Sequence, residues 1–235
     1  MFGLSAFELT ILLAGLAAGL YMAWNIGAND VANSMSTAVG AEAITYKQAI
    51  IIASVLTVAG AVLVGGHVTA TVKGGIFDPA EFSSKKLALG ALSAVLAAGI
   101  WVTIATWQSL PISTSHSIIG GMMGFGLVAG GPAIISWFTL GQVVLSWVTS
   151  PLLGALLAYI IFNIIVKVIF NSEDSFETAR KTSPFFLGAT MFIITLSLFF
   201  DTALDNQLFG RNLPFMEALC ISAVVGVIIG LVGKF

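Results

Sequence analysis

The sequence predicts an all-α integral membrane protein, folded as a multi-span helical bundle with broken or re-entrant helices. Hydrophobic residues make up 58% of its 235 residues and charged residues only 9%, with a mean hydropathy of +1.04. A soluble domain carries about 25% charged residues. Windows without Asp, Glu, Lys or Arg are long enough for helices to cross a bilayer, which takes about 20 residues each. These windows cover residues 9–29, 48–72, 87–166, 182–200 and 218–233.

The third window predicts the broken helices, because it carries no formal charge and yet contains helix-breaking sequences. It is interrupted by "SLPISTSHS", by a Gly-Gly-Pro sequence and by a Ser-Pro sequence. We expect a span over residues 87–107, a hairpin or broken helix over residues 111–130, and one long or two short helices over residues 133–166.

Polar residues gather in two segments outside the apolar windows, and we expect both to be aqueous loops. Residues 67–86 and 167–184 collect most of the charge together with turn-forming Gly, Pro, Asn and Ser. The formal net charge is only −2 and there is no basic stripe, so nucleic acid is not an expected partner. The single cysteine, Cys220, cannot form an internal disulfide.

The stretch "NIGANDVANSM", residues 25–35, places amides and a carboxylate directly after the first apolar window. An aspartate at the bilayer centre costs about 2.5–3.5 kcal/mol, so Asp30 needs a cation, a proton or water as its partner. We expect the helix to unwind at Gly27 and to free backbone carbonyls for a monovalent cation. An alternative is that these residues only cap a second helix at the membrane surface. The candidate cation ligands are Asn29, Asp30 and Asn33, with Asn25 and Ser34 as secondary candidates.

The stretch "PISTSHS", residues 111–117, combines a proline with consecutive hydroxyls and predicts a helix N-terminus. Free backbone N–H groups, the positive end of the helix dipole and Ser/Thr hydroxyls together form an anion site. The candidate anion ligands are Ser113, Thr114 and Ser115. His116 is a secondary candidate, because an imidazole can donate a hydrogen bond to a bound anion, although it is equally compatible with a packing role.

Neither polar stretch contains an arginine or a lysine. The charge of a bound oxyanion must then be balanced by helix dipoles, hydroxyls and co-bound cations. Binding of the anion and of the cation is therefore thermodynamically linked, which is the behaviour of a symporter.

The two motifs resemble those of the inorganic phosphate transporter family, the Pit-type permeases that move phosphate with sodium or protons. "GANDVANSMSTAVGAEAIT" (27–45) is similar to the family signature, and "PISTSHSIIGGMMGFGL" (111–127) is similar to its second motif. The resemblance implies a multi-pass protein of the plasma (inner) membrane with no catalytic residues and no cofactor. It also implies that Asn29, Asp30 and Asn33 belong to the cation and phosphate site, with Asp30 shared, and that residues 113–115 contact phosphate.

The chain departs from this family in two respects. Family members contain two inverted repeats that each carry both motifs, whereas here each motif occurs once. We therefore expect a transporter repeat over residues 1–166, a polar loop over 167–184, and additional helices over 185–235 that lead toward an absent second repeat. That repeat would belong to a longer chain or to a homo-oligomeric partner. Many members also have a glutamate where Thr57 stands, so sodium is favoured over a proton as the coupling ion.

Three other functions remain compatible with these residues. Hydroxyls and helix dipoles would also bind sulfate or another tetrahedral oxyanion. An intramembrane hydrolase would use Ser113 or Ser115 with His116, but neighbouring residues on one turn seldom align a nucleophile with its base. A non-transporting membrane scaffold would use its polar side chains for helix packing alone.

Overall fold

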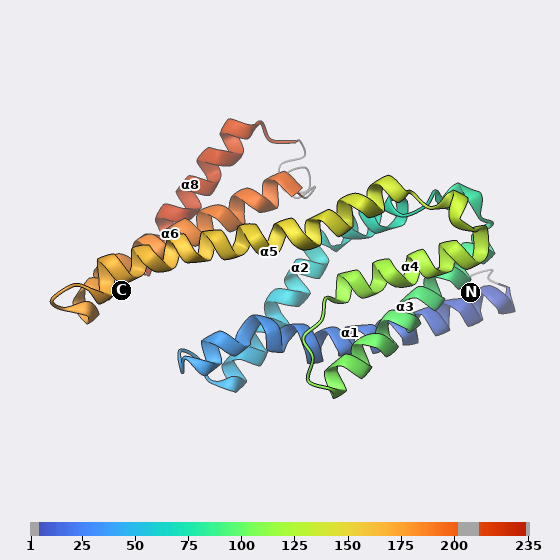
Figure 1. The fold of residues 1–235 in the computed structure, drawn as a ribbon, viewed down its shortest axis with the longest axis horizontal. Coiled ribbons are helices and arrows are strands. Elements are labelled where there is room, and N and C mark those ends of the chain that lie inside the picture. Colours follow the sequence, from blue (N-terminus) through green and yellow to red (C-terminus); the bar gives the residue numbers. More distant parts are fainter. Residues whose placement is uncertain (1–4, 202–211, 234–235) are drawn as a thin grey trace. The chain divides into compact units, whose positions relative to one another are not determined.

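A computed structural model describes residues 5–201 and 212–233, with the exception of the side chains of residues 63, 64, 66–74, 200 and 201. The regular elements in these ranges are helices, and an isolated bridge joins Phe77 to Ile135 (Figure 1). This confirms the prediction of an all-α protein. The long helices are α1 (Ala6–Gly40), α2 (Tyr46–Gly75), α3 (Ser84–Trp107), α4 (Thr114–Gly130), α5 (Trp137–Ile165), α6 (Ser175–Asp201) and α8 (Phe215–Val232).

Side-chain caps start several of these helices, just before an apolar window at Ser5, Thr45 and Ser83 and inside the third window at Ser113. Ser5 and Thr45 each form a capping box, in which the hydroxyl accepts from the third helical N–H and the third side chain returns a bond. Ser83 and Ser113 cap α3 and α4 in the same way through their hydroxyls. Five of the described helices are long and apolar enough to cross a membrane, which supports an integral multi-pass protein.

The chain divides into two compact units, one up to Gly141 and one from Gln142 onward. In the first unit, α3 and α4 form an antiparallel hairpin, and α1 runs alongside α3 (Figure 1). A side chain at Gly121 would lie 2.7 Å from the carbonyl oxygen of Ala94, so glycine permits the close approach of α4 to α3. A small apolar core of Met22, Ala98 and Val102 joins α1 to α3.

In the second unit, α6 packs against α8 through glycines. A side chain at Gly188 would lie 2.8 Å from the carbonyl oxygen of Gly226, and one at Gly230 would lie 2.7 Å from that of Pro184. The two backbones are therefore in direct contact along this pair, as in other membrane helix pairs with small residues at the interface.

Several expectations from the sequence are wrong in detail. The helix does not unwind at Gly27, because α1 continues to Gly40 and its polar side chains find partners on α3 and on the segment before α4. Residues 111–130 do not form a hairpin: a short extended segment leads into the single helix α4. Within residues 133–166, α5 (Trp137–Ile165) is one long helix, which is one of the two arrangements expected. A 3-10 turn at Pro132–Ile134 precedes it, and a π-helical turn at Val166–Phe170 follows it.

The two expected loops are shorter than the polar sequence predicts. α2 continues to Gly75, so only the second part of segment 67–86 lies outside it, and the helix stops at a Gly-Gly pair. α6 begins at Ser175 inside segment 167–184. The polar residues of this segment stabilise the start of α6. Asp174 accepts from the N–H of Glu177 at 2.9 Å, and Glu177 forms an ion pair with Lys181 at 3.4 Å.

Candidate functional site

Three asparagines spaced by four residues form a stripe along α1: Asn25, Asn29 and Asn33. Asn25 and Asn29 are buried, with 3% and 5% of their surface exposed, whereas Asn33 is exposed. The stripe exists because α1 stays helical through Gly27. Regular helical spacing, rather than an unwound backbone, therefore presents the amides of Asn25 and Asn29 to α3.

Asn29 connects α1 to α3 and to the segment of residues 108–113, which we call the α3–α4 linker. Its Nδ2 donates to Oγ1 of Thr106 at 3.0 Å and to the carbonyl oxygen of Leu110 at 3.1 Å. Its Oδ1 accepts from the N–H of Ile112 at 3.2 Å and from Nδ2 of Asn33 at 3.3 Å. The amide thus satisfies polar backbone groups of a non-helical linker between two apolar helices.

Asp30 joins the first polar motif to the second. Oγ1 of Thr114, in the first turn of α4, donates to Oδ2 of Asp30 at 2.9 Å. Thr114 is buried with 8% exposed, and Asp30 is half-buried. Residues 84 positions apart in the sequence therefore meet, and the carboxylate lies beside the N-terminus of α4.

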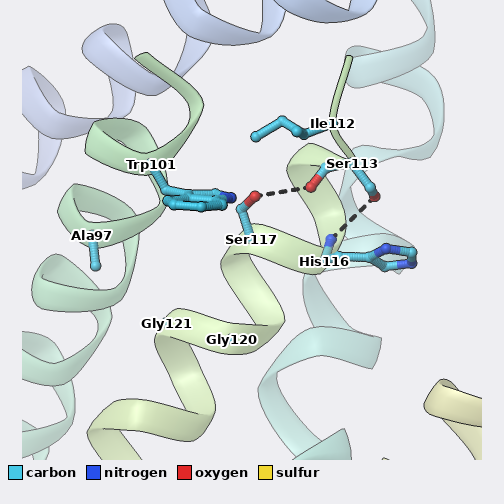
Figure 2. A pocket seen from close by; sticks show the side chains of 8 residues that line it. All are labelled: Ala97, Trp101, Ile112, Ser113, His116, Ser117, Gly120 and Gly121. Carbon is cyan, nitrogen blue, oxygen red and sulfur yellow. Dashed lines mark hydrogen bonds between the residues drawn. The ribbon is translucent and has the colours of Figure 1, made fainter. Parts of the chain in front are cut away.

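The N-terminus of α4 opens onto a pocket of about 570 Å³ between α3 and α4. Oγ of Ser113 accepts from the N–H of His116 at 3.3 Å, and Oγ of Ser117 donates to the carbonyl oxygen of Ser113 at 2.9 Å (Figure 2). The indole of Trp101, from α3, lies against the same pocket (Figure 2). Among the described residues that line it, none is an Asp, Glu, Lys or Arg. The pocket therefore offers hydroxyls and a helix N-terminus instead of a cationic side chain.

The structure brings some of the predicted site residues together and separates others. Two hydrogen-bonded pairs, Asn29 with Asn33 and Asp30 with Thr114, start from adjacent positions of α1 and form the polar cluster. Ser113 and His116 line the neighbouring pocket. Ser115 is exposed next to the cluster, and Ser34 donates its hydroxyl to the carbonyl oxygen of Val31 within α1. Sequence reasoning assigned Asp30 to both the cation and the phosphate site but did not identify the hydrogen bond between Asp30 and Thr114.

Asn25 lies one turn before the cluster and has partners of its own. Its Nδ2 donates to the carbonyl oxygen of Tyr21 at 2.9 Å, and its Oδ1 accepts from Oγ1 of Thr103 at 2.8 Å. The hydroxyl of Tyr21 completes the chain by hydrogen-bonding that of Thr103. Thr103 and Thr106 were not singled out in the sequence, and the signal that could have found them is their spacing of three residues on one face of an uncharged helix.

Carboxylate and amide oxygens are the groups that could hold a cation here. In the described part of the chain, no group of three or more His, Cys, Asp or Glu side chains gathers as in a transition-metal centre. One carboxylate with neutral oxygens around it is instead suited to a hard monovalent cation.

Comparison of this chain with known proteins identifies its family. Residues 26–231 match the model of the phosphate transporter family. A candidate phosphate permease of Pyrococcus furiosus is 46% identical over 199 residues, which cover 84% of this chain and 48% of the relative. The Arabidopsis thaliana protein "Inorganic phosphate transporter 2-1, chloroplastic" is 42% identical over 202 residues, which cover 83% of this chain and 34% of the relative.

A solved structure of "the sodium-dependent phosphate transporter" has a TM-score of 0.85 and 40% identity, and the match covers 96% of this chain and 55% of that chain. This chain thus spans about half the length of the archaeal relative and of the solved structure. The matched proteins are named as permeases and transporters rather than enzymes, which confirms the prediction that the chain is not an enzyme. The chain belongs to the phosphate transporter family.

Proposed function

We propose that this chain forms a phosphate-binding half of a cation-coupled phosphate symporter, with sodium as the coupling ion. The observation that carries the proposal is the hydrogen bond from Thr114 to Asp30, because it ties the candidate cation ligand to the candidate anion site. The name of the sodium-dependent relative supports the choice of ion. Because that relative is about twice as long, we propose that transport in the plasma membrane needs a second half, from a longer chain or from a second copy.

Phosphate would bind at the N-terminus of α4. The N–H groups of the first turn of a helix have no partner within that helix, and the dipole makes this end positive. Ser113 and Ser115 add exposed hydroxyls at this point. Thr114 would contact phosphate only after releasing Asp30, since its hydroxyl donates to that carboxylate. His116, which lines the pocket, would lie close enough to act as a further donor.

Sodium would bind at Asp30, with Asn33 as the neighbouring amide on the exposed side of the stripe. A cation on the carboxylate weakens its attraction for the Thr114 proton and adds positive charge beside the α4 N-terminus. Both effects favour an oxyanion there. A typical coupling free energy of about 1–3 kcal/mol would raise phosphate affinity roughly five- to 150-fold when sodium is bound.

The test is phosphate binding and uptake in proteoliposomes, with and without a sodium gradient. Asp30→Asn keeps the shape of the side chain and removes its charge, so we expect sodium-stimulated phosphate binding to fall at least tenfold. Asp78→Asn is the matched control, because that carboxylate lies outside the long helices and caps the short turn Pro79–Glu81.

Three results would overturn the proposal in different ways. Phosphate binding that is unchanged in Asp30→Asn removes Asp30 from the site. Stimulation by a proton gradient without sodium changes the coupling ion. Equal competition by sulfate broadens the substrate to tetrahedral oxyanions in general.

A further inference from the structure

The side-chain amide of Asn29 uses all of its hydrogen-bond donors and acceptors within the protein. An asparagine amide has two donors and two acceptor sites, and here the donors reach Thr106 and Leu110 while the acceptors receive Ile112 and Asn33. The side chain is also 95% buried, since only 5% of the residue is exposed. A cation could use its Oδ1 only after displacing one of two hydrogen bonds, from the linker N–H of Ile112 or from the amide of Asn33.

Two of these bonds act on the backbone of the linker. Asn29 bonds the carbonyl oxygen of Leu110 and the N–H of Ile112, the groups on either side of Pro111. Pro111 has no N–H of its own. The side-chain amide therefore pairs with the extended segment as the peptide group of a neighbouring strand would, although no strand is assigned there in the described residues.

The linker sets the position of the α4 N-terminus. It leaves α3 through Ser109, whose φ of 58° is in the left-handed region, and it reaches the N-cap Ser113 directly after Ile112. Backbone bonds to the last turn of α3 close this turn, from the N–H of Leu110 to the carbonyl oxygen of Ala105 at 2.9 Å. Beyond the turn, Asn29 bonds the linker on both sides of Pro111.

We propose that Asn29 is a positioning residue, not a cation ligand, and that it holds the α3–α4 linker so that the α4 N-terminus faces the pocket. The location of phosphate at that N-terminus rests on the proposed function, whereas the hold on the linker does not. The role follows from the four bonds of the Asn29 amide and revises the sequence-based assignment of Asn29 as a cation ligand.

The first experiment measures the linker itself and needs no phosphate. A spin label is attached at Leu110→Cys in a Cys220→Ser background, because the Leu110 side chain is 51% exposed while its carbonyl oxygen accepts from Asn29. We expect Asn29→Ala and Asn29→Asp to increase the mobility of the label at least twofold. Asn25→Ala is the matched control: it removes another buried amide between α1 and α3, whose bonds go to Tyr21 and Thr103 and not to the linker, so the label should stay immobile.

The second experiment distinguishes a positioning role from cation binding by the direction in which sodium and phosphate affinities change. Asn29→Asp keeps the oxygen atoms and adds charge, so a cation ligand would bind sodium more tightly and keep its phosphate affinity. A positioning residue loses its two donors, and we expect phosphate affinity to fall at least tenfold without any gain in sodium affinity. Thr106→Val removes only the acceptor on α3, and we expect a smaller fall of about threefold. Ser93→Ala, which removes a hydroxyl bonded within α3, should leave both affinities unchanged.

The inference is overturned if the label at residue 110 is as immobile in Asn29→Asp as in the unmodified chain, or if Asn29→Asp binds sodium more tightly with unchanged phosphate affinity. If the label becomes mobile while no variant binds phosphate, the proposed phosphate site fails and the positioning of the linker stands. A mobile label with phosphate affinity intact shows that the linker does not determine binding and also overturns the inference.

Discussion

The α1–α3 pair and the α6–α8 pair solve the same packing problem with different chemistry. Lipid gives little hydrophobic drive for helices to associate, so they need close backbone contact or hydrogen bonds between them. Between α1 and α3, side chains bond across the interface, as Asn29 does to Thr106 and Thr103 to Asn25. Between α6 and α8, glycines bring the backbones together, and the buried Ser222 donates to Ala218 of its own helix.

The difference shows where a polar solute can be accommodated. The polar interface leaves a carboxylate and a helix N-terminus side by side at Asp30 and Thr114. The glycine interface borders a pocket of about 440 Å³ lined by residues such as Phe185, Phe192 and Leu231, which have no charge to offer. Both pairs are packed, but only the first combines packing with a carboxylate beside a helix N-terminus, which are the kinds of group that bind ions in proteins.

The largest effect is expected at the glycine interface. In Gly226→Val, the new Cβ would start 2.7 Å from the carbonyl oxygen of Gly188, and a backbone atom cannot move aside as a flexible side chain can. We expect the free energy of unfolding to fall by about 3 kcal/mol, at the upper end for overpacked sites. The measurement is denaturant unfolding in detergent micelles.

The matched control for this prediction is Gly154→Val. Gly154 is also inside a membrane helix, but a Cβ there would meet no other atom within 4 Å. If both variants lose equal stability, the effect belongs to the valine and not to the contact between α6 and α8.

The next effect is expected at the bond that joins the two motifs. Thr114→Val keeps the shape and removes the hydroxyl that donates to Asp30. A hydrogen bond to a charged group contributes about 1.5–3 kcal/mol, and we expect the unfolding free energy to fall by about 1.5 kcal/mol because Asp30 remains half-exposed. Thr114→Ser should restore it. The adjacent exposed Ser115→Ala is the control, and a loss there as large as in Thr114→Val would contradict the assignment.

The sequence was sufficient for the fold class and for the location of both polar motifs. The length of an apolar window indicates directly that the segment can cross the bilayer. A carboxylate next to such a segment is energetically costly, and this cost marks it as a candidate site residue. The sequence was not sufficient to predict the hydrogen bond between Asp30 and Thr114. The two residues are 84 positions apart, and no pattern in either motif indicates that they meet. Single hydroxyls such as Thr106 were missed because membrane helices commonly contain them.

The prediction that the helix unwinds at Gly27 was wrong for a related reason. Glycine permits a helix to unwind, but unwinding occurs only where freed backbone groups find partners. Here the side chains of the stripe have partners on α3 and on the linker, so α1 stays intact. The charged segments were read as loops because a local polar pattern does not distinguish a loop from a helix that leaves the bilayer.

The smallest effect is expected at the end of the polar interface farthest from the site. Tyr21→Phe removes the hydroxyl that bonds Thr103 and keeps the ring, which packs so closely on Gly99 that a Cβ there would lie 2.7 Å from it. Interhelical hydrogen bonds in membranes average about 0.6 kcal/mol, and we expect a loss of that size in unfolding free energy. Tyr46→Phe, at a ring that is 72% exposed, should cause no loss. Phosphate affinity should not change in either variant, because Thr103 can still donate to Asn25 and the bonds of Asn29 are untouched. A large fall in phosphate affinity in Tyr21→Phe would mean that the whole α1–α3 interface, and not Asn29 with its linker, sets the geometry of the site.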